Sequence, residues 1–294
     1  MLCWCRKARR EWRNPFLPYE EDLWVQHLSE SHTLLLNKFN IVPHHCLVVT
    51  RRFEAQEEPL DEADFAATWM ALQVGRDAAG TGRGRGGDRA GRGGAGLTNT
   101  LRLPDGCPAV SQAPPNGALA FYNCGPLSGA SQPHKHVQLL PLPIWEAAPA
   151  GETGATTFTR HILAATANSV PWAAEELRSL PFASFAARLP AADEECSPAA
   201  LAAAYAGLLQ RCTEFAGSRG PGQGEEGPAP LSYNMVLTRT FMMLVPRRAE
   251  ADGPISCNSV AFAGSFFVRS TEELGYVRGT GPMRILSSVG FPWE

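Results

Sequence analysis

The chain has 294 residues, 44% of them hydrophobic, so it is long enough to bury a substantial core. Its formal net charge is −3 and its pI is about 6.2, so its bulk electrostatics does not favour a nucleic-acid or membrane-surface protein. Its sequence contains no apolar run that approaches the roughly 20 residues that span a bilayer.

The first part of the chain predicts a hairpin, a helix and a surface insertion. Two short apolar runs, Leu34–Leu36 and Cys46–Val49, flank a polar turn that contains proline, which is typical of a hairpin. Residues 61–74 have an acidic start and helix formers around spaced apolar side chains, which predicts a helix. Glycine and arginine dominate residues 80–96, and almost nothing there can pack against a core. We expect a surface insertion there, in preference to an RNA-binding tract.

The second part adds further strands and one long helix. The patterns predict strands at 118–123 and 134–143, a helix at 199–216, a loose loop at 217–230, a hairpin at 231–247 and a further strand region at 258–270. Strands that come in adjacent pairs, with helices between the pairs, favour an α+β fold with a mostly antiparallel sheet. We expect a basic lead at 1–13 and one domain at 14–294, whose N-terminal and C-terminal parts meet at residue 150.

The eight cysteines are scattered, without a Cys-x-x-Cys pair or the spacing of a disulfide framework. The start of the chain is basic but has no apolar segment for secretion. We therefore expect reduced thiols in a cytoplasmic protein, although a basic start is also found in organelle-targeting segments.

The central motif is the segment "HKHVQ", in which His134, His136 and Gln138 occupy every second position. Side chains alternate between the two faces of a strand, so these three would share one face. The preceding loop, "NCGPLSGASQP", combines glycines, which let main-chain amides approach a ligand, with Ser and Gln donors. The pattern indicates a phosphate-binding loop beside a nucleophilic imidazole.

A metal site and a pair of structural core histidines are the alternatives. A catalytic zinc needs a third protein ligand, and a neutral carboxamide such as that of Gln138 is a poor one. His44 and His45 could complete such a site in space, but we favour a site without metal.

Five segments together resemble a known family. They are "NPFLPYEEDLWV", "LLLNKFNIVPHHCLVVTRRFEAQEEPL", "FYNCGPLSGASQPHKHVQLLP", "YNMVLTRTFMMLVPR" and "NSVAFAG", in that order from residue 14. The chain resembles the diadenosine tetraphosphate phosphorylases, the fungal-type ATP adenylyltransferases of the histidine-triad superfamily. The central motif is also similar to that of the hexose-1-phosphate uridylyltransferases, including galactose-1-phosphate uridylyltransferase. The resemblance implies a histidine-triad-like catalytic domain.

The resemblance also implies roles for individual residues. His136 would attack the α-phosphorus and become a nucleotidyl-histidine, Gln138 would hold a phosphoryl oxygen without titrating, and His134 would orient the site or bind phosphate oxygens. Judged by residue type alone, Asn37, Lys38 and Arg269 would be turn or surface residues. The resemblance instead assigns substrate binding to Asn37, Lys38, Asn123, Gly129, Ala130, Ser131, Gln132, Asn258, Phe262, Ala263, Gly264 and Arg269.

The implied activity is reversible cleavage of diadenosine tetraphosphate by phosphate, which gives ATP and ADP. We expect these nucleotides and phosphate as ligands, no tightly bound cofactor, and Mg²⁺ only as a companion of the substrate. The alternatives are a sulfate-using adenylyltransferase, a nucleoside-diphosphate phosphorylase, and a nucleotide-binding protein without turnover, because only 13 residues precede Asn14 where relatives have some tens. The sequence leaves open the preferred base, the phosphate chain length, the acceptor anion and the oligomeric state.

Overall fold

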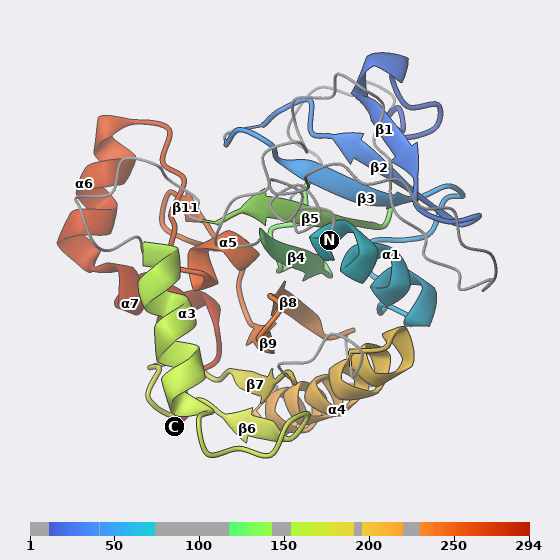
Figure 1. The fold of residues 1–294 in the computed structure, drawn as a ribbon. Helices are drawn as coiled ribbons and strands as arrows, with labels where there is room; N and C mark the ends of the chain where they lie inside the picture. Colours follow the sequence, from blue (N-terminus) through green and yellow to red (C-terminus); the bar gives the residue numbers. More distant parts are fainter. Residues whose placement is uncertain (1–11, 41, 74–117, 143–153, 191–195, 220–229) are drawn as a thin grey trace, which may run out of the picture.

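The computed structural model describes residues 12–40, 42–73, 118–142, 154–190, 196–219 and 230–294. Within these ranges, nine strands form one sheet in the order β1-β2-β3-β5-β4-β8-β9-β7-β6, and every neighbouring pair is antiparallel. Figure 1 shows this sheet running from β1 at the top to β6 at the bottom. The strands are β1 Trp24–His27, β2 His32–Leu36, β3 Cys46–Thr50, β4 Ala118–Cys124, β5 His136–Pro141, β6 Ala174–Glu176, β7 Phe185–Arg188, β8 Ser232–Leu237 and β9 Phe241–Arg247, with a separate pair β10 Ala251–Asp252 and β11 Ile255–Ser256.

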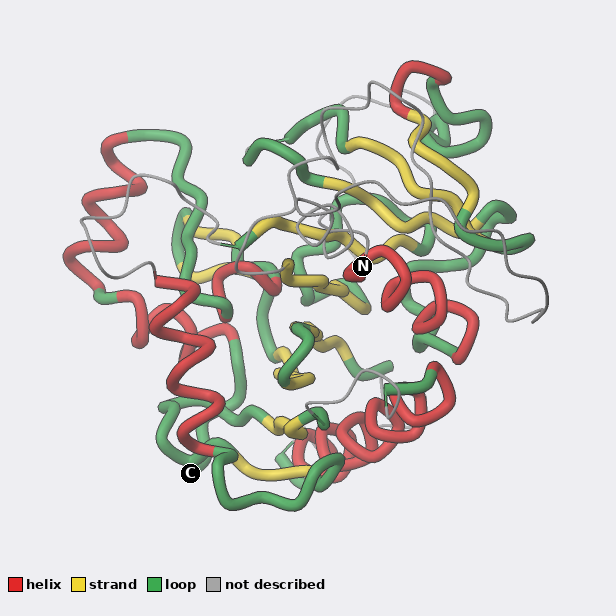
Figure 2. The backbone as a smooth tube through the Cα atoms, in the orientation of Figure 1, coloured by secondary structure: helices red, strands yellow, loops and turns green. Residues whose placement is uncertain are grey.

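The helices lie on both sides of the strand layer (Figures 1 and 2). They are the 3-10 turn η1 Glu21–Leu23 and the helices α1 Glu62–Gln73, α3 Gly154–Ala165, α4 Pro198–Gly217, α5 Ser259–Phe262, α6 Thr271–Thr280 and α7 Pro282–Val289. Helix α4 begins with a capping interaction, because the Ser197 hydroxyl accepts a hydrogen bond from the Ala200 N–H at 3.2 Å and Pro198 follows directly. None of the helices in the described ranges has the length and apolarity needed to cross a membrane.

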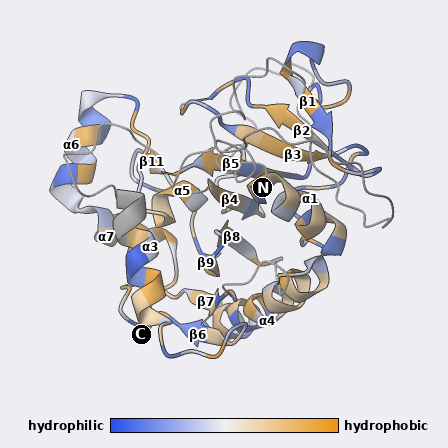
Figure 3. Cartoon of the chain, viewed as in Figure 1, coloured by the Kyte–Doolittle hydropathy of each residue, from blue (hydrophilic) through white to orange (hydrophobic). Residues whose placement is uncertain are grey.

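The two larger of three apolar clusters lie on the two faces of the sheet. One joins α1 and α4 to strand residues such as Val137 and Leu139, and the other joins α3, α5 and α7 to residues such as Phe121 and Leu140. Figure 3 shows the apolar colour along most of β2 and β3, two strands whose side chains are mainly buried. Since side chains alternate along β5, Val137 and Leu139 face α1 and α4, and His136 and Gln138 face the side of α5.

Most of the predicted elements are confirmed. The predicted hairpins are β2–β3 and β8–β9, the predicted helices are α1 and α4, and the predicted strands around the central motif are β4 and β5. The antiparallel α+β class is confirmed as well. The insertion at 80–96 and most of the loop at 217–230 lie outside the described residues.

The prediction of a strand region at 258–270 is wrong, because these residues form the short helix α5 followed by irregular chain. Asn258 is the physical reason, since its side-chain oxygen accepts a hydrogen bond from the Val260 N–H at 3.0 Å and caps a helical turn. The two expected parts of the chain share one sheet, because β4 pairs with β8 and Asn123 lies opposite Asn234.

Candidate active site

A pocket of about 770 Å³ lies on the α5 side of the sheet. Its floor is formed by side chains of β5 and its neighbours, including His136, Gln138 and Leu140. Its walls come from the segment after β2, the loop before β5 and residues 256–269. The volume and mainly apolar lining, with a few convergent polar groups, are typical of a small-molecule site.

His136 has a defined tautomer and is held at the floor of this pocket. Its Nδ1–H donates to the carbonyl oxygen of His134 at 2.7 Å, so Nε2 carries no proton and keeps its lone pair. Burial, with the neighbouring His134 and His45, lowers the pKa of His136 to about 4. The imidazole is therefore neutral at pH 7, and Nε2 is available as a nucleophile.

Gln56 fixes the main chain of His136. Its side-chain oxygen accepts from the His136 N–H at 2.8 Å, and its side-chain nitrogen donates to the carbonyl oxygen of Asn123 at 2.9 Å. The Gln56 side chain thus bridges β4 and β5 where the nucleophile stands. Sequence reasoning assigned no role to Gln56, and its residue type in "EAQEEPL" carries no signal of one.

His134 is fully buried, and both of its ring nitrogens have protein partners. Its Nε2–H donates to the Thr50 carbonyl oxygen at 2.9 Å, and its Nδ1 accepts from the Asn14 side-chain amide at 2.9 Å. The rings of Phe16 and Phe53 pack against it, with centroids 5.5 and 5.4 Å away. Of the two roles expected for His134, this geometry favours the orientation of the site.

Gln138 is the last acceptor in a chain of hydrogen bonds in which Asn37 donates to His45 and His45 donates to Gln138. Its side-chain oxygen can only accept, so His45 Nε2–H donates to it at 3.0 Å. His45 Nδ1 then accepts from the Asn37 side-chain amide at 3.2 Å, while the Asn37 side-chain oxygen accepts from the Phe39 N–H at 2.9 Å. Burial lowers the pKa of His45 to about 4, so the relay is neutral at pH 7. In the described part of the chain the Gln138 amide nitrogen has no acceptor, so it can donate to a ligand.

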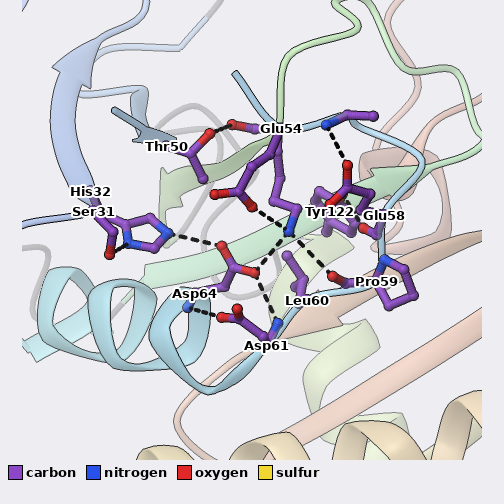
Figure 4. Close-up of polar contacts among 12 residues, drawn as sticks. Ser31, His32, Thr50, Glu54, Glu58, Pro59, Leu60, Asp61, Asp64 and Tyr122 are labelled. Carbon is purple, nitrogen blue, oxygen red and sulfur yellow. Dashed lines mark hydrogen bonds and ion pairs between the residues drawn. The ribbon is translucent and has the colours of Figure 1, made fainter. Parts of the chain in front are cut away.

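Lys135 anchors β5 from the opposite face of the sheet. Its ammonium is buried and lies 2.8 Å from a Glu54 carboxylate oxygen and 3.3 Å from one carboxylate oxygen of Asp64. The other Asp64 oxygen accepts from His32 Nε2 at 2.8 Å, and Figure 4 labels His32, Glu54 and Asp64 in this network. Burial alone would lower the pKa of Lys135 and raise that of Asp64, but their mutual attraction and hydrogen bonds reverse both directions. This network holds the start of β5, where His136 lies.

The structure brings part of the predicted binding set to the pocket. The members of this set that line the pocket are Asn37, Lys38, Gly129, Ser131, Gln132, Asn258 and Arg269. Gly129 has a φ of +75°, and a Cβ there would meet the Cys257 carbonyl oxygen at 2.6 Å, so only glycine lets these segments approach.

The other predicted binding residues, namely Asn123, Ala130, Phe262, Ala263 and Gly264, are not among the lining. Asn123 is buried, and its side-chain oxygen accepts from the Ser259 N–H at 3.0 Å. Phe262 packs against Phe182 in the core, and Val260 and Ala261 reach the pocket instead because α5 turns their side chains toward it.

The charged residues of the lining are few. Lys38 and Arg269 are cations and Glu20 is an anion, so their formal sum is 2 − 1 = +1. Glu20 lies 2.6 Å from the Lys38 ammonium, and both side chains are more than half exposed. Within the described ranges no cluster of three His, Cys, Asp or Glu side chains is arranged to hold a metal ion.

Two protein-family models match the chain. The family model described as Ap4A phosphorylase N-terminal domain matches residues 5–92 and 109–151, where Ap4A is diadenosine tetraphosphate. The model described as ATP adenylyltransferase C-terminal domain matches residues 178–292.

Two curated proteins of Saccharomyces cerevisiae are similar to the chain. Diadenosine 5',5'''-P1,P4-tetraphosphate phosphorylase 2 is 28% identical over 267 residues, which cover 89% of this chain and 70% of that protein. Protein APA1 is 26% identical over 268 residues, which cover 90% of this chain and 70% of that protein.

Solved structures show the same similarity. The crystal structure of the yeast Ap4A phosphorylase Apa2 with AMP has a TM-score of 0.68 and 26% identity, and covers 95% of this chain and 81% of that one. The structure of Apa2 with Ap4A has a TM-score of 0.66 and 25% identity, and covers 95% and 80% respectively. The chain therefore belongs to the Ap4A phosphorylase family, whose N-terminal domain and ATP adenylyltransferase C-terminal domain it carries in that order.

Proposed function

We propose that the chain is a nucleotidyltransferase that cleaves Ap4A with phosphate to ATP and ADP, through an adenylyl group on His136. The observation that carries the proposal is the tautomer of His136, which leaves an unprotonated Nε2 on a residue at the pocket floor. The same steps run in reverse when ATP and ADP are in excess, since each is a displacement at the same phosphorus.

In the first step, the lone pair of His136 Nε2 forms a bond to the α-phosphorus. The bond from that phosphorus to the bridging oxygen breaks, and ATP leaves with the electron pair. In the second step, a phosphate oxygen attacks the same phosphorus, the N–P bond breaks, the electron pair returns to Nε2, and ADP leaves. Two displacements replace one, and each has a good leaving group.

Gln138 stabilises the charge that develops on the phosphoryl group. Because His45 fixes the Gln138 oxygen as an acceptor, the amide nitrogen donates to a non-bridging oxygen of the α-phosphate. A hydrogen bond to a charged group contributes about 1.5–3 kcal/mol, and this donor is in place before the reaction begins. The carboxamide does not titrate, which favours an intermediate that waits for phosphate.

The remaining lining supplies binding surface for nucleotides. Phe39 is 79% exposed at the pocket, and such a ring offers a stacking face to a purine. Lys38, Ser131 and Asn258 provide donors for phosphate oxygens. Since the lining has a formal charge of only +1, we propose that Mg²⁺ arrives with the polyphosphate and that no metal stays resident.

The proposed location is the cytoplasm. It is supported by Cys124, Cys212 and Cys257, which are buried free thiols whose pKa values are raised by burial.

The proposal is tested by product analysis with purified protein, Ap4A and Mg²⁺ at millimolar phosphate. We expect equal amounts of ATP and ADP, formed at a rate that rises with phosphate. AMP as the main product would make the protein a hydrolase. A parallel reaction with sulfate tests the sulfate-using alternative, for which adenylyl sulfate would replace ADP.

A further inference from the structure

Arg247, the last residue of β9, is a buried cation whose contacts are all with uncharged groups. It is 2% exposed, and its guanidinium donates to six oxygens. Five are the carbonyl oxygens of Ser128, Ala249, Glu250, Cys257 and Val289, and the sixth is the side-chain oxygen of Asn234. None of the ion pairs among the described residues involves Arg247.

A buried charge without a counter-ion is unusual, because burial removes the stabilisation that water provides. Lys135, the other buried Lys or Arg side chain among the described residues, shows the usual solution, since Glu54 and Asp64 pair with it. Burial lowers the pKa of Arg247 to about 10, which is still far above neutral, so the guanidinium stays charged. Among the described residues, the Glu250 carboxylate attracts this charge but forms no ion pair with it, so the charge is not neutralised within its own hydrogen-bond shell.

Arg247 lies directly behind one wall of the pocket. Its Nη1 donates to the carbonyl oxygens of Ser128 at 3.4 Å and Cys257 at 2.9 Å. The residues that follow these two in the chain, Gly129 and Asn258, both line the pocket. The guanidinium thus lies behind a wall that is one layer of main chain thick.

The same two contacts orient two N–H groups. In a trans peptide the C=O and the following N–H point in opposite directions. With the Ser128 and Cys257 carbonyls directed at Arg247, the N–H groups of Gly129 and Asn258 are directed away from it. Neither N–H has an acceptor in any hydrogen bond among the described residues. A pair of free amide donors backed by a positive charge is a typical site for an anion.

We propose that Arg247 is a positioning residue for the phosphates of the substrate, which bind at the wall formed by Gly129 and Asn258. Its hydrogen bonds aim the two amides at a phosphate, and its charge adds to the formal +1 of the lining. The inference rests on the proposed function, because it takes nucleotide phosphates as the occupants of this pocket.

The test compares the binding of adenosine with that of ATP by calorimetry. Across one layer of main chain, at an effective dielectric constant of about 20, removing one positive charge weakens the binding of a singly charged anion about tenfold. We expect Arg247→Gln to weaken ATP binding about tenfold and adenosine binding less than twofold. Arg247→Lys keeps the charge and should retain most of the preference for ATP. Arg248→Gln is the matched control, since Arg248 is the exposed neighbour and its guanidinium, within the described ranges, donates only to the carbonyls of residues 287 and 288.

A second measurement uses the unaltered protein and so does not depend on how the variants fold. In ¹⁵N-labelled protein, saturating ATP should move the amide proton resonances of Gly129 and Asn258 downfield, and saturating adenosine should not. An unchanged preference for ATP in a folded Arg247→Gln, or two amides that do not respond to ATP, would overturn the inference. If the unaltered protein binds ATP no more tightly than adenosine, the proposed function fails instead.

Discussion

The relay from Asn37 through His45 to Gln138 predicts that His45 controls the rate of adenylyl transfer without contacting the reacting atoms. The informative change is His45→Phe, which keeps a ring beside Phe121 but removes both nitrogens. Without the donor at 3.0 Å, the Gln138 amide no longer has one preferred orientation.

The size of the effect follows from that single hydrogen bond. A hydrogen bond between neutral groups contributes about 0.5–1.5 kcal/mol, so the productive orientation becomes about two- to tenfold less populated. We expect the rate of adenylylation to fall by about that factor. Nucleotide affinity should change less, because the base does not depend on the orientation of the amide.

The assay is a single turnover of Ap4A on excess protein without phosphate, with the adenylylated protein measured against time. His44→Asn is the matched control, since His44 is the exposed neighbour and has a φ of 62°, which asparagine tolerates. In a Gln138→Ala background, His45→Phe should add almost nothing, because the two residues act through one contact. Fully additive effects, or an unchanged rate in His45→Phe alone, would refute the relay.

Four further predictions concern the same site. His136→Ala should abolish covalent labelling while calorimetry still detects nucleotide binding, and labelling at another residue would contradict the assignment. Gln138→His should increase the ratio of AMP to ADP released from adenylylated protein by about one to two orders of magnitude; an unchanged ratio would remove the role given to the carboxamide. The pKa values of His45 and His136 are lowered to about 4, so the unfolded chain takes up protons first and stability should fall as pH drops from 6.5 to 4. Urea titrations at pH 7 and pH 5 measure this slope, which His45→Phe should reduce. Dialysis against a chelator followed by Mg²⁺ should restore full activity, and stoichiometric zinc lost together with activity would argue for a resident metal.

The part of the fold that follows from local patterns could be predicted from the sequence. The alternation in "HKHVQ" places His136 and Gln138 on one face and Val137 on the other, as β5 does in the structure. His134, which the same pattern placed beside them, precedes β5 and is buried outside the pocket lining. At residues 258–270 the local pattern predicted the wrong element. Their β-branched and aromatic composition is typical of a strand, whereas a capping contact from Asn258 begins the helix α5.

The supporting residues of the site could not be predicted, because their roles depend on contacts between distant positions. His45 lies 93 residues from Gln138, Gln56 lies 80 residues from His136, and Arg247 lies 119 residues from Ser128. The residue types histidine, glutamine and arginine do not by themselves indicate these roles, which arise because the sheet places the three side chains beside the central motif. In the same way, only the pairing of β4 with β8 places Asn123 under the loop instead of in the pocket.

In the proposed reaction His136 carries an adenylyl group that phosphate removes. The direct measurement is to incubate the protein with Ap4A in the absence of phosphate, determine the intact mass and locate the modification by peptide mapping, and then add phosphate. We expect one adenylyl group on His136, released as ADP when phosphate is added. An unmodified protein that still forms ATP and ADP, or an adenylyl group that leaves only as AMP, would contradict it.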